Sequence, residues 1–110
     1  EAFAGCVHVK TPAVAPHSRH VFHQYTLQLA EGTDRDALIA HLNSKGIPAM
    51  IYYPVPLRKQ KAYDTHDYDD SAYPNTDFLV RSVLSLPMHT ELDREQVDYI
   101  SGAVKEFFSK

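Results

Sequence analysis

Two prolines separated by a single residue, Pro54 and Pro56, constrain this chain more than any other feature. Each proline fixes its own φ angle, lacks a backbone donor and pushes the residue before it into an extended conformation. The segment from Tyr52 to Leu57 can therefore neither coil into a helix nor continue inside a sheet. Because residues 47–53 before it are largely apolar, we predict a strand there that delivers a rigid loop.

The rigid loop carries two phenols, Tyr52 and Tyr53, followed by the cations Arg58, Lys59 and Lys61. Two tyrosines at a strand end are also ordinary strand formers, with one ring buried and the other exposed. A short run of cations, taken alone, is more often a solvated loop face than a ligand site. The combination of stiffness, phenols and positive charge favours a phosphorylated ligand that contains a ring.

Apolar periodicity predicts the elements around this loop. Alternating residues indicate a strand over 21–29. Thr33 and Asp36 form a capping-box pattern ahead of a helix that ends at residues 45–46. A short helix capped by Asn75 or Thr76 should then precede a brief strand over 84–86.

The last helix has the clearest signals. Asp93 is a good N-cap residue, and Gln96 stands at the capping-box position. The helix carries an apolar stripe on one face, formed by Val97, Ile100, Val104 and Phe107 or Phe108. The predicted fold class is α/β (α+β), in the order β-α-β-loop-α-β-α. It has a small mixed or antiparallel three-stranded sheet with helices packed on it.

Length and charge restrict the classes of function. A chain of 110 residues fits one domain, and a net charge of −3 gives no general attraction to nucleic acid. No apolar run approaches the roughly 18 residues of a membrane span. A single cysteine, Cys6, fits a reducing, cytoplasmic setting. The acidic segment 64–71 is predicted to be a mobile, solvated surface excursion.

Histidines spaced by three residues, His17, His20 and His23, raise the possibility of a metal site. His23 lies in the alternating strand and His17 follows a proline, so the three should not converge on one ion. A packed, hydrogen-bonded role is favoured for His23. Cys6 has no adjacent base, and no lysine has apolar neighbours that would activate it. We therefore predict no metal site and no catalytic nucleophile.

Three motifs in a fixed order connect the chain to a known family. Residues 20–26 (HVFHQYT), 46–63 (GIPAMIYYPVPLRKQKAY) and 83–88 (VLSLPM) resemble the C-terminal part of the DegT/DnrJ sugar-nucleotide aminotransferases. These enzymes use pyridoxal phosphate and have the type I aspartate aminotransferase fold. The resemblance implies that residues 20–110 are the C-terminal small domain. Residues 1–19 would be an extended linker from a missing N-terminal large domain.

The resemblance also implies what the chain lacks. The lysine that forms a Schiff base with the cofactor, and most of the cofactor pocket, belong to the large domain. No catalytic or cofactor-binding residue is therefore expected in this fragment, which should not hold pyridoxal phosphate tightly. The parent would be a cytoplasmic homodimer that moves an amino group from an amino acid such as glutamate to a nucleotide-linked keto-sugar. Polysaccharide or amino-sugar biosynthesis uses such products.

The site residues follow from the matching positions. In the family, the pair at Tyr52 and Tyr53 approaches the sugar of the substrate, often in the partner subunit's active site. Tyr52 stands where many members have histidine, which leaves stacking and hydroxyl hydrogen bonds as its chemistry. Gln60 matches directly, and Arg58 adds charge that favours an anionic group, a diphosphate or a uronate. The pattern looks closest to members that aminate the sugar C3 position. The alternative is a non-catalytic binding or interaction domain with the same fold.

Overall fold

The sheet at the centre of the structure has three antiparallel strands. A computed structural model describes residues 2–63 and 67–109. In the sheet order, Val9–Lys10 (β1) pairs with Tyr25–Leu29 (β2), and β2 pairs with Val83–Leu86 (β3). Val9 faces Leu29 across the first pair, and Leu27 faces Leu84 across the second. The predicted α/β class with a small three-stranded sheet is confirmed.

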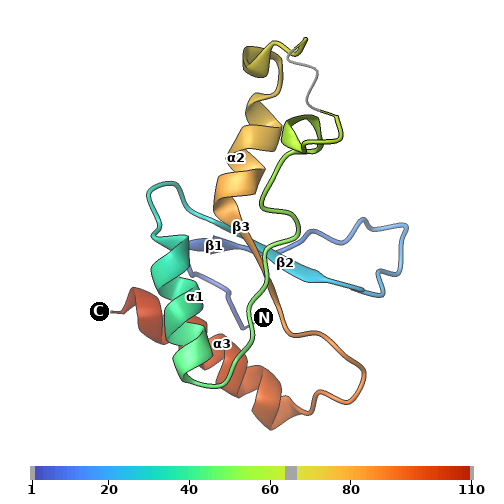
Figure 1. Ribbon diagram of the computed structural model, residues 1–110. Helices are drawn as coiled ribbons and strands as arrows, with labels where there is room; N and C mark the ends of the chain where they lie inside the picture. The colour runs from blue at the N-terminus through green and yellow to red at the C-terminus, as the bar shows by residue number, and fades with distance from the viewer. Residues whose placement is uncertain (1, 64–66, 110) are drawn as a thin grey trace.

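Three helices surround this sheet in two groups (Figure 1). The helices Arg35–Ser44 (α1) and Arg94–Phe108 (α3) lie together on one side of the sheet. The helix Pro74–Ser82 (α2) projects away from it, beside the 3₁₀ turn Leu57–Lys59 (η1). A second 3₁₀ turn, Asp70–Ala72 (η2), immediately precedes α2. We call the projecting part, residues 51–63 and 67–82, the arm.

The hydrophobic core lies between the sheet and the pair α1 and α3. Burying one leucine side chain fully stabilises a fold by about 1.5–3 kcal/mol relative to leaving it in water. The large side chains with no more than 1% exposure are those of Leu27, Leu29, Leu38, Leu42, Leu84 and Val104. The core therefore holds β2, β3, α1 and α3 together, whereas the arm projects beyond it.

Helix ends follow local chemistry closely. The predicted capping box of α3 is confirmed. The Asp93 carboxylate accepts a bond of 2.8 Å from the Gln96 amide, and the Asp93 amide donates to Gln96 Oε1 at 3.1 Å. The predicted cap of α1 is shifted by one residue, because the Thr33 amide closes a turn to Ala30 and leaves Asp34 as the N-cap. Gly46 follows that helix with φ of 72°, as predicted.

The predicted cap of α2 is wrong. This helix begins at Pro74 after Tyr73, which makes no side-chain capping bond, rather than after Asn75 or Thr76. Proline suits the first helical position, because its φ angle is already helical and its missing donor would have had no partner there.

The predicted strand over 47–53 is also wrong. Met50 alone pairs with β3, through an isolated bridge to Ser85. Pro48 before this bridge and Pro54 after it each lack a backbone N–H donor, so a longer ladder cannot form. The first predicted strand is shorter than expected, because Phe22 adopts φ of 46° and β2 begins only at Tyr25. The third strand is instead β1, inside the segment 1–19 that we predicted to be an extended linker. The boundary at residue 19 stays a prediction.

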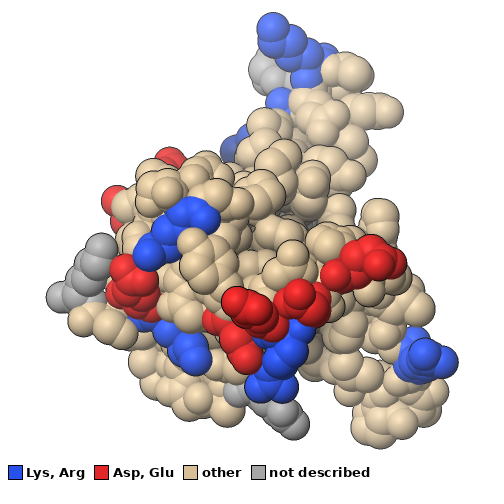
Figure 2. Space-filling view, turned by 90° about the horizontal axis from the view of Figure 1, so that it is seen from below, with Lys and Arg blue, Asp and Glu red and all other residues tan. Residues whose placement is uncertain are grey.

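Charged side chains are mixed on the face seen in Figure 2, which shows acidic and basic groups side by side. α3 contributes to the ion pairs of Lys45 with Glu106 at 2.9 Å and of Arg94 with Asp98 at 2.8 Å. Within residues 2–63 and 67–109, no helix is long and apolar enough to cross a membrane. Of the acidic segment, residues 64–66 lie outside the described part of the chain.

Candidate functional site

The three motif segments converge on one small pocket. Its volume is about 230 Å³, and it opens beside the end of β3. The first motif contributes the residues just before β2, the second contributes the segment entering the arm, and the third contributes the end of β3. The lining residues are His23, Gln24, Pro48, Met50, Tyr52, Ser85, Leu86, Pro87 and Met88.

Ser85 anchors the floor of this pocket. Its amide donates to the Met50 carbonyl at 2.7 Å, and its carbonyl accepts from the Met50 amide at 3.0 Å. Its hydroxyl lies 2.8 Å from Oγ1 of Thr26 on β2. Only 3% of Ser85 is exposed. The backbone pair therefore places the segment entering the arm directly against β3, two residues before Tyr52.

Tyr52 lines the pocket, and the ring of Tyr53 lies beside the ring of Tyr52. Their ring centroids are 5.9 Å apart in an edge arrangement, and their exposed fractions are 38% and 70%. The idea that one ring is buried as an ordinary strand residue is therefore wrong. No residue of the described ranges hydrogen-bonds to either phenol oxygen. Both hydroxyls can therefore donate to or accept from a polar ligand.

Arg58 lies elsewhere, on η1 beside the start of α2 in the arm, and only 8% of it is exposed. Nε donates to Asp70 at 3.0 Å and Nη2 donates to Asp77 at 2.6 Å. The guanidinium carbon sits 4.9 Å from the centroid of the Tyr73 ring. We expected Arg58 to contact an anionic substrate. In the structure its guanidinium is instead occupied by two carboxylates and a ring.

The ion pairs around Arg58 move the pKa values of Arg58 and Asp70 away from their ordinary values. The hydrogen bond to Asp77, with the further pairing to Asp70, raises the pKa of Arg58 despite its burial. The contacts from Lys59 and Arg58 lower the pKa of Asp70. Lys59 Nζ lies 3.1 Å from Oδ2 of that carboxylate. Asp70 is therefore ion-paired, although its side chain is 59% exposed, as the predicted surface excursion requires.

Gln60 and Lys61 are exposed on the arm. The Gln60 amide donates to the Leu57 carbonyl at 3.1 Å and so ends η1. Of the four predicted substrate contacts, the structure places Tyr52 in the pocket with Tyr53 beside it. It places Arg58 and Gln60 on η1 and just after it, outside the lining of that pocket.

Sequence reasoning missed Ser85 and Met50 as pocket residues, and it assigned His23 a packed role. His23 is exposed and lines the pocket, so the packed role is wrong. A serine inside the apolar run 83–86 was the available signal for a buried, hydrogen-bonded hydroxyl. Among the described residues, no three His, Cys, Asp or Glu side chains are arranged to hold a metal ion.

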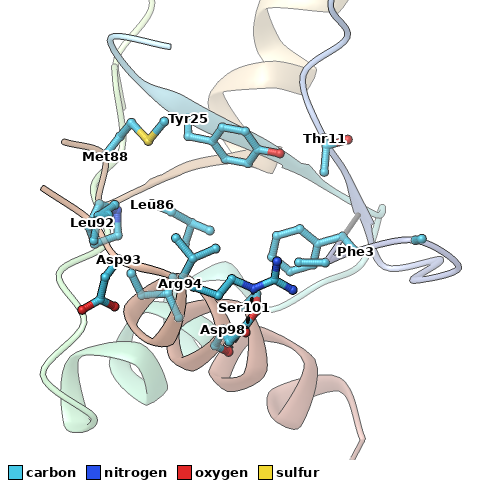
Figure 3. A pocket seen from close by; sticks show the side chains of 15 residues that line it. Phe3, Thr11, Tyr25, Leu86, Met88, Leu92, Asp93, Arg94, Asp98 and Ser101 are labelled. Atoms are coloured by element: carbon cyan, nitrogen blue, oxygen red, sulfur yellow. Dashed lines mark hydrogen bonds and ion pairs between the residues drawn. The ribbon is translucent and has the colours of Figure 1, made fainter. Parts of the chain in front are cut away.

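A larger cavity of about 680 Å³ lies on the other side of residues 86–88. Figure 3 shows Phe3 entering it from the N-terminal segment and Tyr25 from β2, with α3 below. Leu92, Val97 and Ile100 add apolar lining, and none of the predicted substrate contacts reaches it. Asp93, Arg94 and Asp98 add charged groups to this otherwise largely apolar lining.

Comparisons with known proteins agree with the three motifs. The sequence profile of the DegT/DnrJ/EryC1/StrS aminotransferase family matches residues 1–105. A pleiotropic regulatory protein of Geobacillus stearothermophilus is 38% identical over 100 residues, which are 91% of this chain and 26% of that protein. A UDP-N-acetyl-3-dehydro-α-D-glucosamine 3-aminotransferase of Acidithiobacillus ferrooxidans is 37% identical over 97 residues, which are 88% of this chain and 25% of that protein.

The fold also matches solved structures. DesV of S. venezuelae, crystallised in complex with a ketimine intermediate, superposes with a TM-score of 0.87 at 31% identity. That match covers 99% of this chain and 29% of DesV. The chain thus spans about a quarter of the length of the curated relatives named above.

Proposed function

This chain belongs to the DegT/DnrJ/EryC1/StrS aminotransferase family, and we propose that it is the C-terminal small domain of an enzyme that aminates a nucleotide-linked keto-sugar. The observation that carries the proposal is the convergence of three sequence-distant motifs on one pocket. A pocket lined by Tyr52, with the exposed ring of Tyr53 beside it, is suited to a sugar, because phenols combine an apolar ring with a hydrogen-bonding hydroxyl.

The role of the small domain is to position the substrate. Tyr52 lines the pocket, and the Tyr53 ring lies beside it with 70% exposure. Both phenols would orient the sugar so that its carbonyl carbon faces the amine of the cofactor. Gln60, exposed on the arm, would contact a more distant part of the same substrate. Amination at C3 is the proposed position, and the name of the Acidithiobacillus relative supports it.

Pyridoxal phosphate, when bound, supplies the electron sink that moves an amino group between carbon atoms. The described lysines do not fit a site that holds it. Lys45 pairs with Glu106 and Lys59 pairs with Asp70, while Lys10, Lys61 and Lys105 are exposed. We therefore assign the cofactor-holding lysine to the large domain of the parent. This chain contributes substrate-positioning groups and no covalent step.

Three further features of the parent belong to the same proposal. The relatives are several times longer than this chain, which supports a large domain in the parent polypeptide. The apolar cavity between Phe3 and Ile100 is a surface that such a domain would cover. Homodimerisation, a cytoplasmic location and glutamate as the amino donor follow from the family resemblance.

The test is borohydride reduction after incubation with pyridoxal phosphate, followed by peptide mass mapping. It compares the complete natural gene product with this 110-residue chain. We expect a phosphopyridoxyl lysine upstream of Glu1 in the complete protein and none in the chain. No stable adduct in either protein would contradict the proposal and favour the alternative, a non-catalytic binding or interaction domain with the same fold.

A further inference from the structure

Arg58 is the centre of an ion-pair cluster that joins separate parts of the arm. The Arg58 cluster consists of Arg58, Lys59, Asp70, Tyr73 and Asp77. Arg58 and Lys59 come from η1, Asp70 comes from η2, and Asp77 lies in the first turn of α2. The cluster is electrically balanced, because two cations face two carboxylates. It therefore ties η1 to η2 and α2 without leaving a net charge for a ligand.

The geometry of Arg58 suits a clamp rather than a ligand contact. Its guanidinium group donates from Nε to Asp70 at 3.0 Å and from Nη2 to Asp77 at 2.6 Å. Its flat face covers the Tyr73 ring at 4.9 Å. Arginine presents several donors in a rigid plane, whereas lysine presents one compact charge. A substrate phosphate could reach Nε, or the Nη2 hydrogen that Asp77 accepts, only by displacing one of these carboxylates.

The segment that carries the tyrosine pair is held at both ends. Met50 is fixed to Ser85 by the backbone pair of 2.7 and 3.0 Å, and Arg58 is fixed by its carboxylates. Between these anchors, packing contributes little. Tyr53 is 70% exposed, Val55 44% and Leu57 64%.

The prolines make the two anchors effective. Pro54 and Pro56 fix two φ angles and restrict the residues before them. Few backbone angles in the segment therefore remain free to absorb a shift at one end. Releasing the Arg58 end should leave the tyrosine pair attached through Met50 only.

We propose that Arg58, held by Asp77 and Asp70, is a positioning residue that keeps Tyr52 in the pocket lining and Tyr53 beside it. This inference rests on the proposed function, in which the tyrosine pair contacts the sugar nucleotide. It replaces the expected direct contact between Arg58 and the substrate. It also gives Asp77, a residue outside the pocket lining, an effect on substrate binding.

Backbone ¹⁵N relaxation of this chain tests the inference without any ligand. In the unaltered chain, Tyr52 and Tyr53 should have order parameters near 0.85, the value typical of rigid backbone. Arg58→Ala and Asp77→Ala should each lower these values below about 0.6, the flexible range. The double variant should lower them no further, because both changes release the same anchor. Arg94→Ala, which removes an exposed Arg–Asp pair on α3, is the matched control and should change nothing in the arm.

Two results would overturn the inference. One is an unchanged order parameter at Tyr52 and Tyr53 in the Arg58 variant, even if η1 itself becomes mobile. The other is a loosened tyrosine pair in the Arg58 variant but not in the Asp77 variant. Circular dichroism confirms that each variant is folded at the measuring temperature. If Arg58→Ala does not fold, Asp77→Asn retains the side-chain volume and carries the same prediction.

Kinetics of the complete protein separate this inference from the proposed function. With a UDP-linked 3-keto-sugar as the probe, Arg58→Ala and Asp77→Ala should raise the KM for that sugar by similar factors. The KM for glutamate should not change. A direct contact predicts the opposite for Asp77→Ala, which would free Arg58 and leave the sugar KM unchanged or lower. If the unaltered protein does not aminate the probe, the proposed function fails for that sugar, while the relaxation experiment still decides the role of Arg58.

Discussion

Replacing Thr26 with Val should destabilise the chain, because the buried hydroxyl of Ser85 loses its hydrogen-bond partner. In the folded state, Thr26 Oγ1 and Ser85 Oγ are 2.8 Å apart, and Ser85 is only 3% exposed. Valine keeps the shape of threonine but has no hydroxyl. The Ser85 hydroxyl then loses its partner in a place that water hardly reaches. A stranded buried polar group costs about 1–3 kcal/mol, so we expect a loss of that size.

Removing the other hydroxyl of the pair, that of Ser85, should cost less stability. Ser85→Ala removes the buried hydroxyl itself, and the half-buried Thr26 can still turn its hydroxyl to water. Only the net value of the hydrogen bond is lost, about 0.5–1.5 kcal/mol. The double variant should therefore be closer in stability to Ser85→Ala than the sum of the two single changes predicts.

Urea unfolding followed by circular dichroism measures these differences, since a chain of this size is expected to unfold in one step. Each kcal/mol should also lower the melting temperature by about 4–8 °C. Thr90→Val is the matched control, because Thr90 is exposed and the same chemical change there should cost less than about 0.5 kcal/mol. Equal costs for Thr26→Val and Ser85→Ala, or costs that simply add, would refute the argument from the stranded hydroxyl.

Four other outcomes are expected. Asp93→Ala should lower the free energy of unfolding of the chain by about 1 kcal/mol through loss of the α3 cap, and Asp93→Asn, which keeps a capping oxygen, should cost much less. Because Lys59 and Arg58 lower the pKa of Asp70 below its ordinary 3.8, its pairing stabilises the fold above that value and is lost as pH falls through the folded-state pKa. Acid unfolding of Asp70→Asn should therefore depend less steeply on pH below 4 than that of the unaltered chain. In the complete protein, Tyr53→Phe should raise the KM for the sugar nucleotide roughly 2- to 10-fold, the value of one neutral hydrogen bond, without changing the KM for the amino donor. Light scattering of the isolated chain at high concentration should show self-association through exposed apolar surface, and a monomer would contradict this.

Local signals predicted the start of α3 and the glycine that follows α1, because capping depends on residues a few positions apart. Asp93 and Gln96 satisfy each other within one turn. Strands are harder to predict, because an extended segment becomes a strand only when a partner offers matching donors. The segment around Met50 is apolar, yet the nearby prolines leave it one bridge to Ser85. β1 was missed because two residues carry no periodicity, and its core side chain, Val9, is buried in a hydrophobic core built from residues far away in the sequence.

The candidate site was predicted only in part. The exposure of Tyr52 and Tyr53 at the end of a stiff loop could be predicted from the two prolines, whereas their contact with the substrate came from the family resemblance and stays a prediction. The role of Arg58 could not, since its partner Asp77 is 19 residues away and Asp70 belongs to a run that looked solvated. Burial of a cation depends on where carboxylates meet it in space, and neither periodicity nor composition records that.

The isolated bridge between Met50 and Ser85 also affects whether the edge strands of the sheet can pair with another molecule. An unpaired edge strand can template pairing with another molecule, which leads to aggregation. Here one edge strand, β1, is only two residues long, and the opposite edge strand, β3, already gives both backbone groups of Ser85 to Met50. Pro48 beside the bridge lacks the donor that a further ladder would need. Association of this domain should therefore use its side-chain surfaces, and fibrils built by adding strands to this sheet should be slow to form.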